Sequence, residues 1–375
     1  MSLLTTGQNG NFPVELTETF GVRETVAKGL CFISHMSFEQ TLDDYIAAEM
    51  QRKHIPGLSL AVVKDGTIVI EKSYGQANVE LRVPATSDTV YEIASITKSF
   101  TATAILLLME DGYLRLDDPL TRYRDGLPTA WDDVTLQHLL THTSGVTQWS
   151  IDWDRSDLSN EDICQAVFVV PLRFLPGTEF EYTDTNYNLL GMIIHRLTVA
   201  PYDTFLRERI FEPLGMISTR HNAVREIVPN RAAGYKWADD RLLNSFRIQW
   251  NHLNVADDVP TNGANGSLLS SLRDLIKWDA ALSTQQILKR SSFDTLWSPI
   301  ILKNALPVPY EHDWAVQDYY GHKLIEFVGG IFGFTTCMSR FVDDYLTVII
   351  LTNQDSKPWD MCKAVAGMYD PTLAP

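Results

Sequence analysis

The chain has 375 residues, of which 45% are hydrophobic and 21% charged, an ordinary composition for a folded protein with a substantial apolar core. Its 47 acidic residues outnumber its 31 basic residues, which gives a formal net charge of −16. Nucleic acid and anionic membrane surfaces are therefore unfavourable partners, because the field of the protein repels them. This length allows either one large domain or two.

Cysteine content and hydropathy indicate the compartment. The 4 cysteines are widely spaced and form no C-x-x-C pair, which is typical of reduced thiols and not of a disulfide framework or a zinc ribbon. No apolar run reaches the roughly 18 residues of a membrane span, and the N-terminus lacks the early positive charge of a secretory signal. We therefore expect a cytoplasmic protein with a flexible N-terminal extension over residues 1–36.

The first predicted elements are a helix and a hairpin. The helix begins after Met36, where Ser37 and Gln40 fit a capping box, and its apolar periodicity continues to about residue 53. Two β-rich runs follow, over residues 58–64 and 67–75, and an Asp-Gly pair joins them. Such a pair between two strands is the strongest short sequence signal of a β-hairpin.

Further along the chain, the pattern changes to helices and then returns to strands. Residues 95–111 are apolar on nearly every side and precede Gly112, which predicts a buried helix with a left-handed stop. Strand signals are sparse from about residue 115 to 265. Two further strands are expected over 332–341 and 345–353, followed by a terminal helix from about Trp359.

Strands at both ends of the chain around a helical middle predict an α+β fold. We expect one antiparallel sheet flanked by helices and built from both chain ends, with a mostly helical second lobe. The expected division places residues 37–115 and 266–375 in the sheet domain and residues 116–265 in the helical lobe. A cleft between these parts is the expected binding place for a ligand.

Ser95 and Lys98 form an S-x-x-K motif at the start of the predicted buried helix. A separation of three residues places the hydroxyl and the amine on one helix face, where a partly desolvated lysine can help to remove the hydroxyl proton. The helix N-terminus adds N–H groups suited to an oxyanion. About one such motif is expected by chance in a chain of average composition, so the motif alone does not assign the site.

A second segment of interest runs from Phe180 to Gly191. By its pattern it is a loop that enters a helix, with Asp184 as the N-cap. Its Tyr182 could instead shuttle the proton of Ser95, provided that the fold brings the two residues together.

These segments together resemble the serine β-lactamase and penicillin-binding protein superfamily. The nearest branches are the class C β-lactamases, the D-alanyl-D-alanine carboxypeptidases and the related serine esterases and transesterases. The resemblance covers nearly everything from Met36 onward and implies a β-lactamase/transpeptidase-like fold, with Ser95 as the acylated nucleophile and Lys98 and Tyr182 as the proton-handling pair. The matching segments, in the order of the family, are Ile55–Val63, Tyr91–Lys98, His138–Gly145, Phe174–Tyr182 and Asn265–Trp278.

One departure from the family is Asp184, because the usual Tyr-x-Asn is Tyr182-Thr-Asp184 here. If Asp184 lies beside Lys98, as the resemblance implies, its carboxylate favours the protonated ammonium and raises the pKa of the lysine. A permanently charged Lys98 cannot be the base. We therefore expect Tyr182 to be the base and Lys98 to support it electrostatically.

A second departure concerns the third motif of the family, which is normally Lys or His, then Thr or a small residue, then Gly. The matching triplet is Phe327-Val-Gly329, without a cation. The oxyanion donors that the resemblance implies are unaffected, since they are the N–H groups of Gly330 and Ser95. An apolar triplet favours neutral or hydrophobic esters over substrates that carry a carboxylate. The expected substrate pocket comprises Phe327, Val328, Ile331 and Phe332.

The expected function is therefore that of a serine hydrolase, most specifically a carboxylesterase, that acts on small-molecule esters or amides through an acyl-enzyme on Ser95, without a cofactor or a metal. A β-lactamase, a D-amino-acid peptidase, an acyltransferase and a non-catalytic binding protein on the same scaffold remain alternatives. His138 and His142 stand four residues apart, a spacing that also suits zinc, but without a third ligand a structural pair is favoured. The sequence leaves the oligomeric state open.

Overall fold

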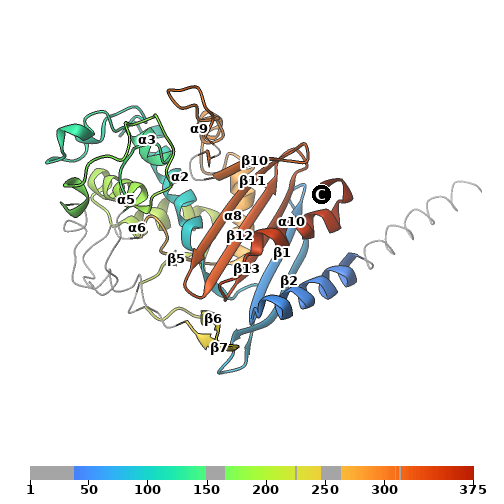
Figure 1. Ribbon diagram of the computed structural model, residues 1–375. Coiled ribbons are helices and arrows are strands. Elements are labelled where there is room, and N and C mark those ends of the chain that lie inside the picture. The colour runs from blue at the N-terminus through green and yellow to red at the C-terminus, as the bar shows by residue number, and fades with distance from the viewer. Residues whose placement is uncertain (1–37, 149–164, 224–225, 246–262, 309, 312–313) are drawn as a thin grey trace, which may run out of the picture. The chain divides into compact units, whose positions relative to one another are not determined.

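The structure, a computed structural model, describes residues 38–148, 165–223, 226–245, 263–308, 310–311 and 314–375 (Figure 1). The expected extension over residues 1–36 and Ser37 of the expected capping box lie outside the described residues. The first predicted helix covers residues 38–53. The chain divides into two compact units, Met1–Ile46 and Ala47–Pro375, and the second holds all the elements below.

An eight-stranded antiparallel sheet is the largest element of the second unit. As predicted, it is built from both ends of the chain, because the first strand pairs with the last. The order across the sheet is β3 (Val83–Pro84), β2 (Thr67–Asn78), β1 (Gly57–Lys64), β13 (Leu346–Thr352), β12 (Phe334–Phe341), β11 (His322–Ile331), β10 (Trp314–Tyr319) and β9 (Tyr310–Glu311).

The predicted hairpin is present, and its turn residues explain it. Asp65 and Gly66 both have positive φ, +52° and +72°, as the tight turn between β1 and β2 requires. The central strands are buried on both faces, because the sheet lies between α8 (Leu272–Leu282) and α10 (Pro358–Tyr369), as Figure 1 shows. Arg340 of β12 binds Asp279 of α8 at 2.8 Å.

The stretch that was predicted to be mostly helical contains helices and also short strands that the sequence does not predict. Strands of two to four residues are too short to show a period of two. The boundaries of the two lobes stay a prediction. The helices described in this stretch include residues 165–168, α3 (Leu136–Leu140), α5 (Asp184–Thr198), α6 (Tyr202–Leu206) and α7 (Glu212–Leu214), with the 3₁₀ turns η2 (Leu120–Arg122) and η3 (Thr129–Trp131) and the π-helical segment η4 (Arg207–Phe211).

The short strands form two small sheets, and the remaining helices lie later in the chain. One sheet has the order β4 (Val90–Glu92), β8 (Leu268–Ser271), β5 (Arg220–His221), and the other is the hairpin β6 (Tyr235–Ala238) and β7 (Arg241–Asn244). Among the described residues, α9 (Arg290–Leu296) precedes β9, and the 3₁₀ turn η6 (Pro371–Leu373) follows α10. Within the described residues, every helix is too short or too polar to span a bilayer.

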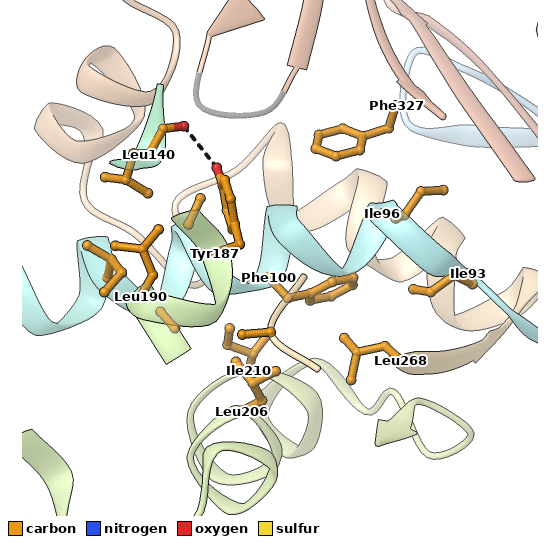
Figure 2. Packing of buried hydrophobic residues seen from close by; sticks show 14 of the residues in the cluster. Ile93, Ile96, Phe100, Leu140, Tyr187, Leu190, Leu206, Ile210, Leu268 and Phe327 are labelled. Carbon is orange, nitrogen blue, oxygen red and sulfur yellow. Dashed lines mark hydrogen bonds between the residues drawn. The ribbon is translucent and has the colours of Figure 1, made fainter. Parts of the chain in front are cut away.

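The predicted buried helix is α2 (Thr97–Glu110), which follows the 3₁₀ turn η1 (Ala94–Ile96). All its residues up to Leu108 are buried, and the chain leaves it through Gly112 at φ +80°. Phe100 of α2 stacks on Trp278 of α8, with ring centroids 4.2 Å apart. Figure 2 shows the apolar side chains that surround α2, with Tyr187 of α5 on one side and Phe327 of the sheet on another. The start of α2 therefore lies in the packed core beside β11.

Candidate active site

The side chains of Lys98 and Tyr182, which come from two distant segments, both approach the hydroxyl oxygen of Ser95. Lys98 Nζ donates a hydrogen bond to Ser95 Oγ at 3.1 Å, and the hydroxyl of Tyr182 lies 3.0 Å from the same atom, although it is 87 residues away in sequence. Ser95 itself lies in η1, directly after Ala94, whose φ of +46° is rare for a residue with a side chain. Such backbone strain is common where a reactive side chain must be held in one position.

Lys98 is fully buried, and oxygen atoms hold its ammonium group from three directions. Besides Ser95 Oγ, Nζ contacts the backbone oxygen of Asn265 at 2.6 Å and Oδ1 of Asp184 at 2.9 Å. It also lies 4.9 Å from the centre of the Tyr182 ring. A buried ammonium requires such compensation, because the loss of hydration is otherwise costly.

Asp184 is the first residue of α5, and the side chains of Lys98 and Gln148 contact its carboxylate. The N-cap of α5 is Thr183, whose side chain accepts from Thr185 N–H, so the prediction that Asp184 is the N-cap is wrong by one residue. Gln148 binds Asp184 twice: Oε1 accepts the backbone N–H at 2.7 Å, and Nε2 donates to the carboxylate at 3.3 Å. Burial raises the pKa of Asp184, but attraction to Lys98 and hydrogen bonds from Lys98 and Gln148 outweigh this effect and hold the pKa below its usual value.

Strand β11 passes very close to the turn that carries Ser95. A Cβ atom added to Gly329 would lie only 2.1 Å from the backbone oxygen of Ile93 and 2.7 Å from Thr336 Oγ1, so only glycine fits there. The Thr336 hydroxyl donates to the same Ile93 oxygen at 3.2 Å. A Cβ atom on Gly330, by contrast, would meet no atom within 4 Å. The role of the Gly330 N–H group as an oxyanion donor stays a prediction.

The apolar residues expected in the substrate pocket do not share one environment. Val328 and Phe332 are 37% and 51% exposed, and Ile331 is partly buried against the core. Phe327 is 2% exposed, and its ring packs edge-on against Trp314, so the structure contradicts its assignment to the pocket. Successive side chains of a strand point to opposite faces, which places Phe327 in the core. Contact of the other three with substrate stays a prediction.

Two residues of the site have no counterpart in the sequence-based expectations. Gln148 follows the His138–Gly145 segment, and Asn265 opens the segment that the resemblance matched further on, but neither was assigned to the site. The contact of Asn265 with Lys98 uses the backbone oxygen, which no residue type reveals. Gln148 contacts a carboxylate 36 positions away, so local spacing gives no signal for it either.

The two histidines that stand four residues apart bind different neighbours. His138 Nδ1 accepts from the backbone N–H of Thr135 at 3.2 Å and completes the capping box of α3. His142 Nδ1 accepts from the backbone N–H of Thr183 at 3.2 Å. Both contacts are of the structural kind that was favoured over a zinc site.

Comparison with known proteins decides the family. The family model described as Beta-lactamase matches residues 42–368. The chain belongs to this family. Penicillin-binding protein 4* of Bacillus subtilis (strain 168) is 30% identical over 319 residues, which cover 81% of this chain and 69% of that protein.

Two solved structures show how far the likeness extends. The octameric penicillin-binding protein homologue from Pyrococcus abyssi matches with a TM-score of 0.74 and 27% identity, over 89% of this chain and 76% of that chain. The D-amino acid amidase from Ochrobactrum anthropi SV3, complexed with D-phenylalanine, matches with a TM-score of 0.71 and 28% identity, over 91% and 98%. The predicted family and α+β fold are thus confirmed, and the protein is a serine hydrolase of the β-lactamase family.

Proposed function

We propose that the protein hydrolyses small esters or amides through an acyl-enzyme on Ser95, and that neutral or hydrophobic carboxylic esters are its preferred acyl donors. The observation that carries this proposal is the approach of Lys98 Nζ and the Tyr182 hydroxyl to Ser95 Oγ, at 3.1 and 3.0 Å. A serine hydroxyl is a weak nucleophile until a neighbouring base takes its proton, and both distances suit direct proton transfer.

Acylation then assigns a role to each of these groups. Asp184 keeps Lys98 charged, and that charge favours the phenolate form of Tyr182. The phenolate takes the proton of Ser95 as Oγ attacks the carbonyl carbon, and the carbonyl electron pair moves to the oxygen, which the N–H groups of Ser95 and Gly330 stabilise. The carbonyl re-forms, the bond to the leaving group breaks, and the leaving alcohol or amine takes the proton from Tyr182.

Deacylation follows the same path with water as the nucleophile. Tyr182, again as phenolate, takes a proton from water as the water oxygen attacks the acyl carbon of the Ser95 ester. The tetrahedral intermediate collapses, Ser95 Oγ takes the proton from Tyr182, and the carboxylic acid leaves. The site thereby returns to its starting state without any further reactant.

The preference for neutral acyl groups rests on the side chains of β11. The position of the third-motif cation holds Phe327, whose ring is buried, and the nearby exposed side chains Val328 and Phe332 are apolar. A substrate carboxylate would therefore not meet the cation that the third motif normally supplies at this position of β11. The net charge of −16 further disfavours anionic substrates at the stage of encounter.

A second candidate is the hydrolysis of D-amino acid amides. The likeness to the Ochrobactrum anthropi amidase favours it, because that match covers nearly the whole of both chains. Such amides carry an ammonium group and no carboxylate, so an apolar residue at the third-motif position of β11 and the negative net charge suit them.

Labelling and a substrate panel test both candidates. The protein is incubated with an alkyl fluorophosphonate, its intact mass is measured, and Ser95→Ala serves as the control. We expect a single adduct that Ser95→Ala lacks, whereas a non-catalytic binding protein would give none. A panel of p-nitrophenyl esters of increasing acyl length, D- and L-phenylalanine amide and a chromogenic cephalosporin then ranks the substrates by kcat/KM. Faster turnover of the D-amide than of every ester would replace the esterase assignment with the amidase.

A further inference from the structure

His142 holds the backbone on both sides of Tyr182. Its backbone oxygen accepts from the N–H of Glu181 at 3.0 Å, and its ring atom Nδ1 accepts from the N–H of Thr183 at 3.2 Å. Its ring also packs on the ring of Tyr182, with centroids 4.5 Å apart and planes inclined by 35°. A single residue therefore fixes the residue before Tyr182, the residue after it and the aromatic ring itself.

This arrangement matters because Tyr182 is not held by burial. Its side chain is 38% exposed, yet its hydroxyl must remain within hydrogen-bonding distance of Ser95 Oγ. Rotation of the backbone at residue 182 would move the phenol oxygen by several times the displacement of the backbone. Main-chain contacts on both sides are the most direct means of preventing such a rotation.

His142 is itself held firmly. It is fully buried, and its φ of +55° sets a backbone conformation that only a few residue types tolerate. Asn186 Nδ2 lies 3.2 Å from Nδ1, and the Asn186 Oδ1 atom accepts from the hydroxyl of Ser144 at 2.7 Å. These contacts fix the imidazole ring relative to α5.

The contact with Thr183 also defines the proton arrangement of the ring. A backbone N–H can only donate, so Nδ1 must be unprotonated, and the proton of the neutral ring resides on Nε2. An N–H at Nδ1 would face the N–H of Thr183 and break this contact.

We propose that His142 is a positioning residue that sets the place of the Tyr182 phenol relative to Ser95. It acts through two main-chain hydrogen bonds and one ring contact, and it touches neither the substrate nor the reacting atoms. The proposal rests on the proposed function of Tyr182 as the proton acceptor.

Two substitutions separate the contacts of His142. His142→Asn retains an acceptor, because Oδ1 of asparagine is bonded to Cγ as Nδ1 of histidine is, and asparagine tolerates positive φ. His142→Phe retains an aromatic ring but removes the acceptor. His138→Phe, in the same segment, is the control, because it removes a partly buried histidine acceptor that serves Thr135 and not the Tyr182 loop.

The measurements are the pre-steady-state acylation rate with a p-nitrophenyl ester, KM, the pH–rate profile and thermal melting. We expect His142→Phe to lower the acylation rate about 100-fold, with KM nearly unchanged, since a misplacement of about 1 Å has that effect on a reacting group. His142→Asn should stay within about tenfold of the wild type. His138→Phe should melt earlier but acylate at the wild-type rate. Wild-type acylation by folded His142→Phe, or an equal loss in His142→Asn, would overturn the proposal.

Nuclear magnetic resonance provides two readouts that do not need activity, and the first of them needs no variant at position 142. Nitrogen-15 shifts of the wild-type imidazole should show Nδ1 unprotonated, and an Nδ1–H tautomer would overturn the proposal. In a Ser95→Ala background, the ζ-carbon titration of Tyr182 should move with His142→Phe and much less with His142→Asn. If the wild type is never acylated, the proposed function fails, while this titration still tests the position of Tyr182.

Discussion

Lys98 Nζ lies 2.9 Å from Asp184 Oδ1, and the lysine side chain is fully buried while 24% of the Asp184 side chain is exposed. The Asp184 carboxylate thus contacts the buried ammonium group of Lys98 while part of the Asp184 side chain remains exposed to solvent. Because the folded pKa of Asp184 is lowered, its contribution to stability is fully present above the ordinary carboxyl pKa of about 4. That contribution is lost as the pH falls further, through the lowered folded value.

The first prediction concerns the pH dependence of catalysis in Asp184→Asn. A negative charge helps both the ammonium of Lys98 and the phenol of Tyr182 to keep their protons, so its removal releases each proton at a lower pH. We expect both limbs of the kcat/KM profile to move toward acid by about one pH unit. Glu181→Gln is the control, since that carboxylate pairs with Arg173 and its removal should leave both limbs in place. An unmoved acid limb in Asp184→Asn would reject Tyr182 as the base.

The second prediction separates two tyrosines by their roles. Tyr182→Phe removes the proposed base from a partly exposed side chain, so kcat/KM should fall about 10²–10⁴-fold with little change in the melting temperature. The hydroxyl of Tyr187 is buried and donates to the backbone oxygen of Leu140 (Figure 2), so Tyr187→Phe should lower stability by about 1 kcal/mol. The loss of kcat/KM in Tyr187→Phe should be at least tenfold smaller than the loss in Tyr182→Phe. Equal losses of activity in both variants would contradict these assignments.

The third prediction uses two adjacent glycines of β11. Gly329→Ala forces a methyl group against the backbone of Ile93, and we expect a loss of about 3 kcal/mol in the free energy of unfolding, together with loss of acylation. Gly330→Ala has open space for the same methyl group, so its free energy of unfolding should stay within about 0.5 kcal/mol of the wild type. Urea denaturation measures both values. Equal stability of the two variants would show that β11 does not pass the Ser95 turn as closely as described.

The fourth prediction concerns a buried carboxylate far from Ser95 in sequence. Asp274 of α8 is 1% exposed and accepts from the backbone N–H groups of Ser218 and Thr219, at 2.7 and 2.8 Å. Asp274→Ala leaves both donors unsatisfied and should lower the free energy of unfolding by about 3 kcal/mol or more. Asp294→Ala removes an exposed carboxylate that pairs with Arg290, and it should change stability by less than about 0.5 kcal/mol. A similar loss in both variants would argue against the buried network.

The parts of the fold that the sequence predicted are those with local signals. The Asp65–Gly66 turn and the buried helix after Ser95 depend on residues within a few positions of one another, and both are confirmed. The contact between Ser95 and Lys98 is also local, since three residues separate them on a helical turn. The approach of Tyr182 was expected only from the resemblance to a family, because no local pattern relates it to Ser95.

The parts that were missed depend on long-range contacts or on strand alternation. The backbone oxygen of Asn265 contacts a lysine 167 positions away, and a backbone atom carries no sequence signature. The contact of Gln148 with Asp184 likewise joins residues that are distant in sequence, 36 positions apart. Phe327 was misassigned because a run of apolar residues was taken as one surface, although a strand divides such a run between two faces.

The pairing of β1 with β13 has a consequence for biosynthesis. β1 is almost wholly buried, and its Leu58 faces Thr352, so this apolar strand can pair with β2 at once but is synthesised about 290 residues before β13. At a synthesis rate of about 5–20 residues per second, this delay is roughly 15–60 seconds. During this time the apolar strand β1 is prone to aggregation, which chaperones counteract. The glycines of β11 also arrive late. If these glycines complete the site as proposed, a nascent chain that already contains Ser95, Lys98 and Tyr182 is still inactive, and activity begins only after β11 has been synthesised.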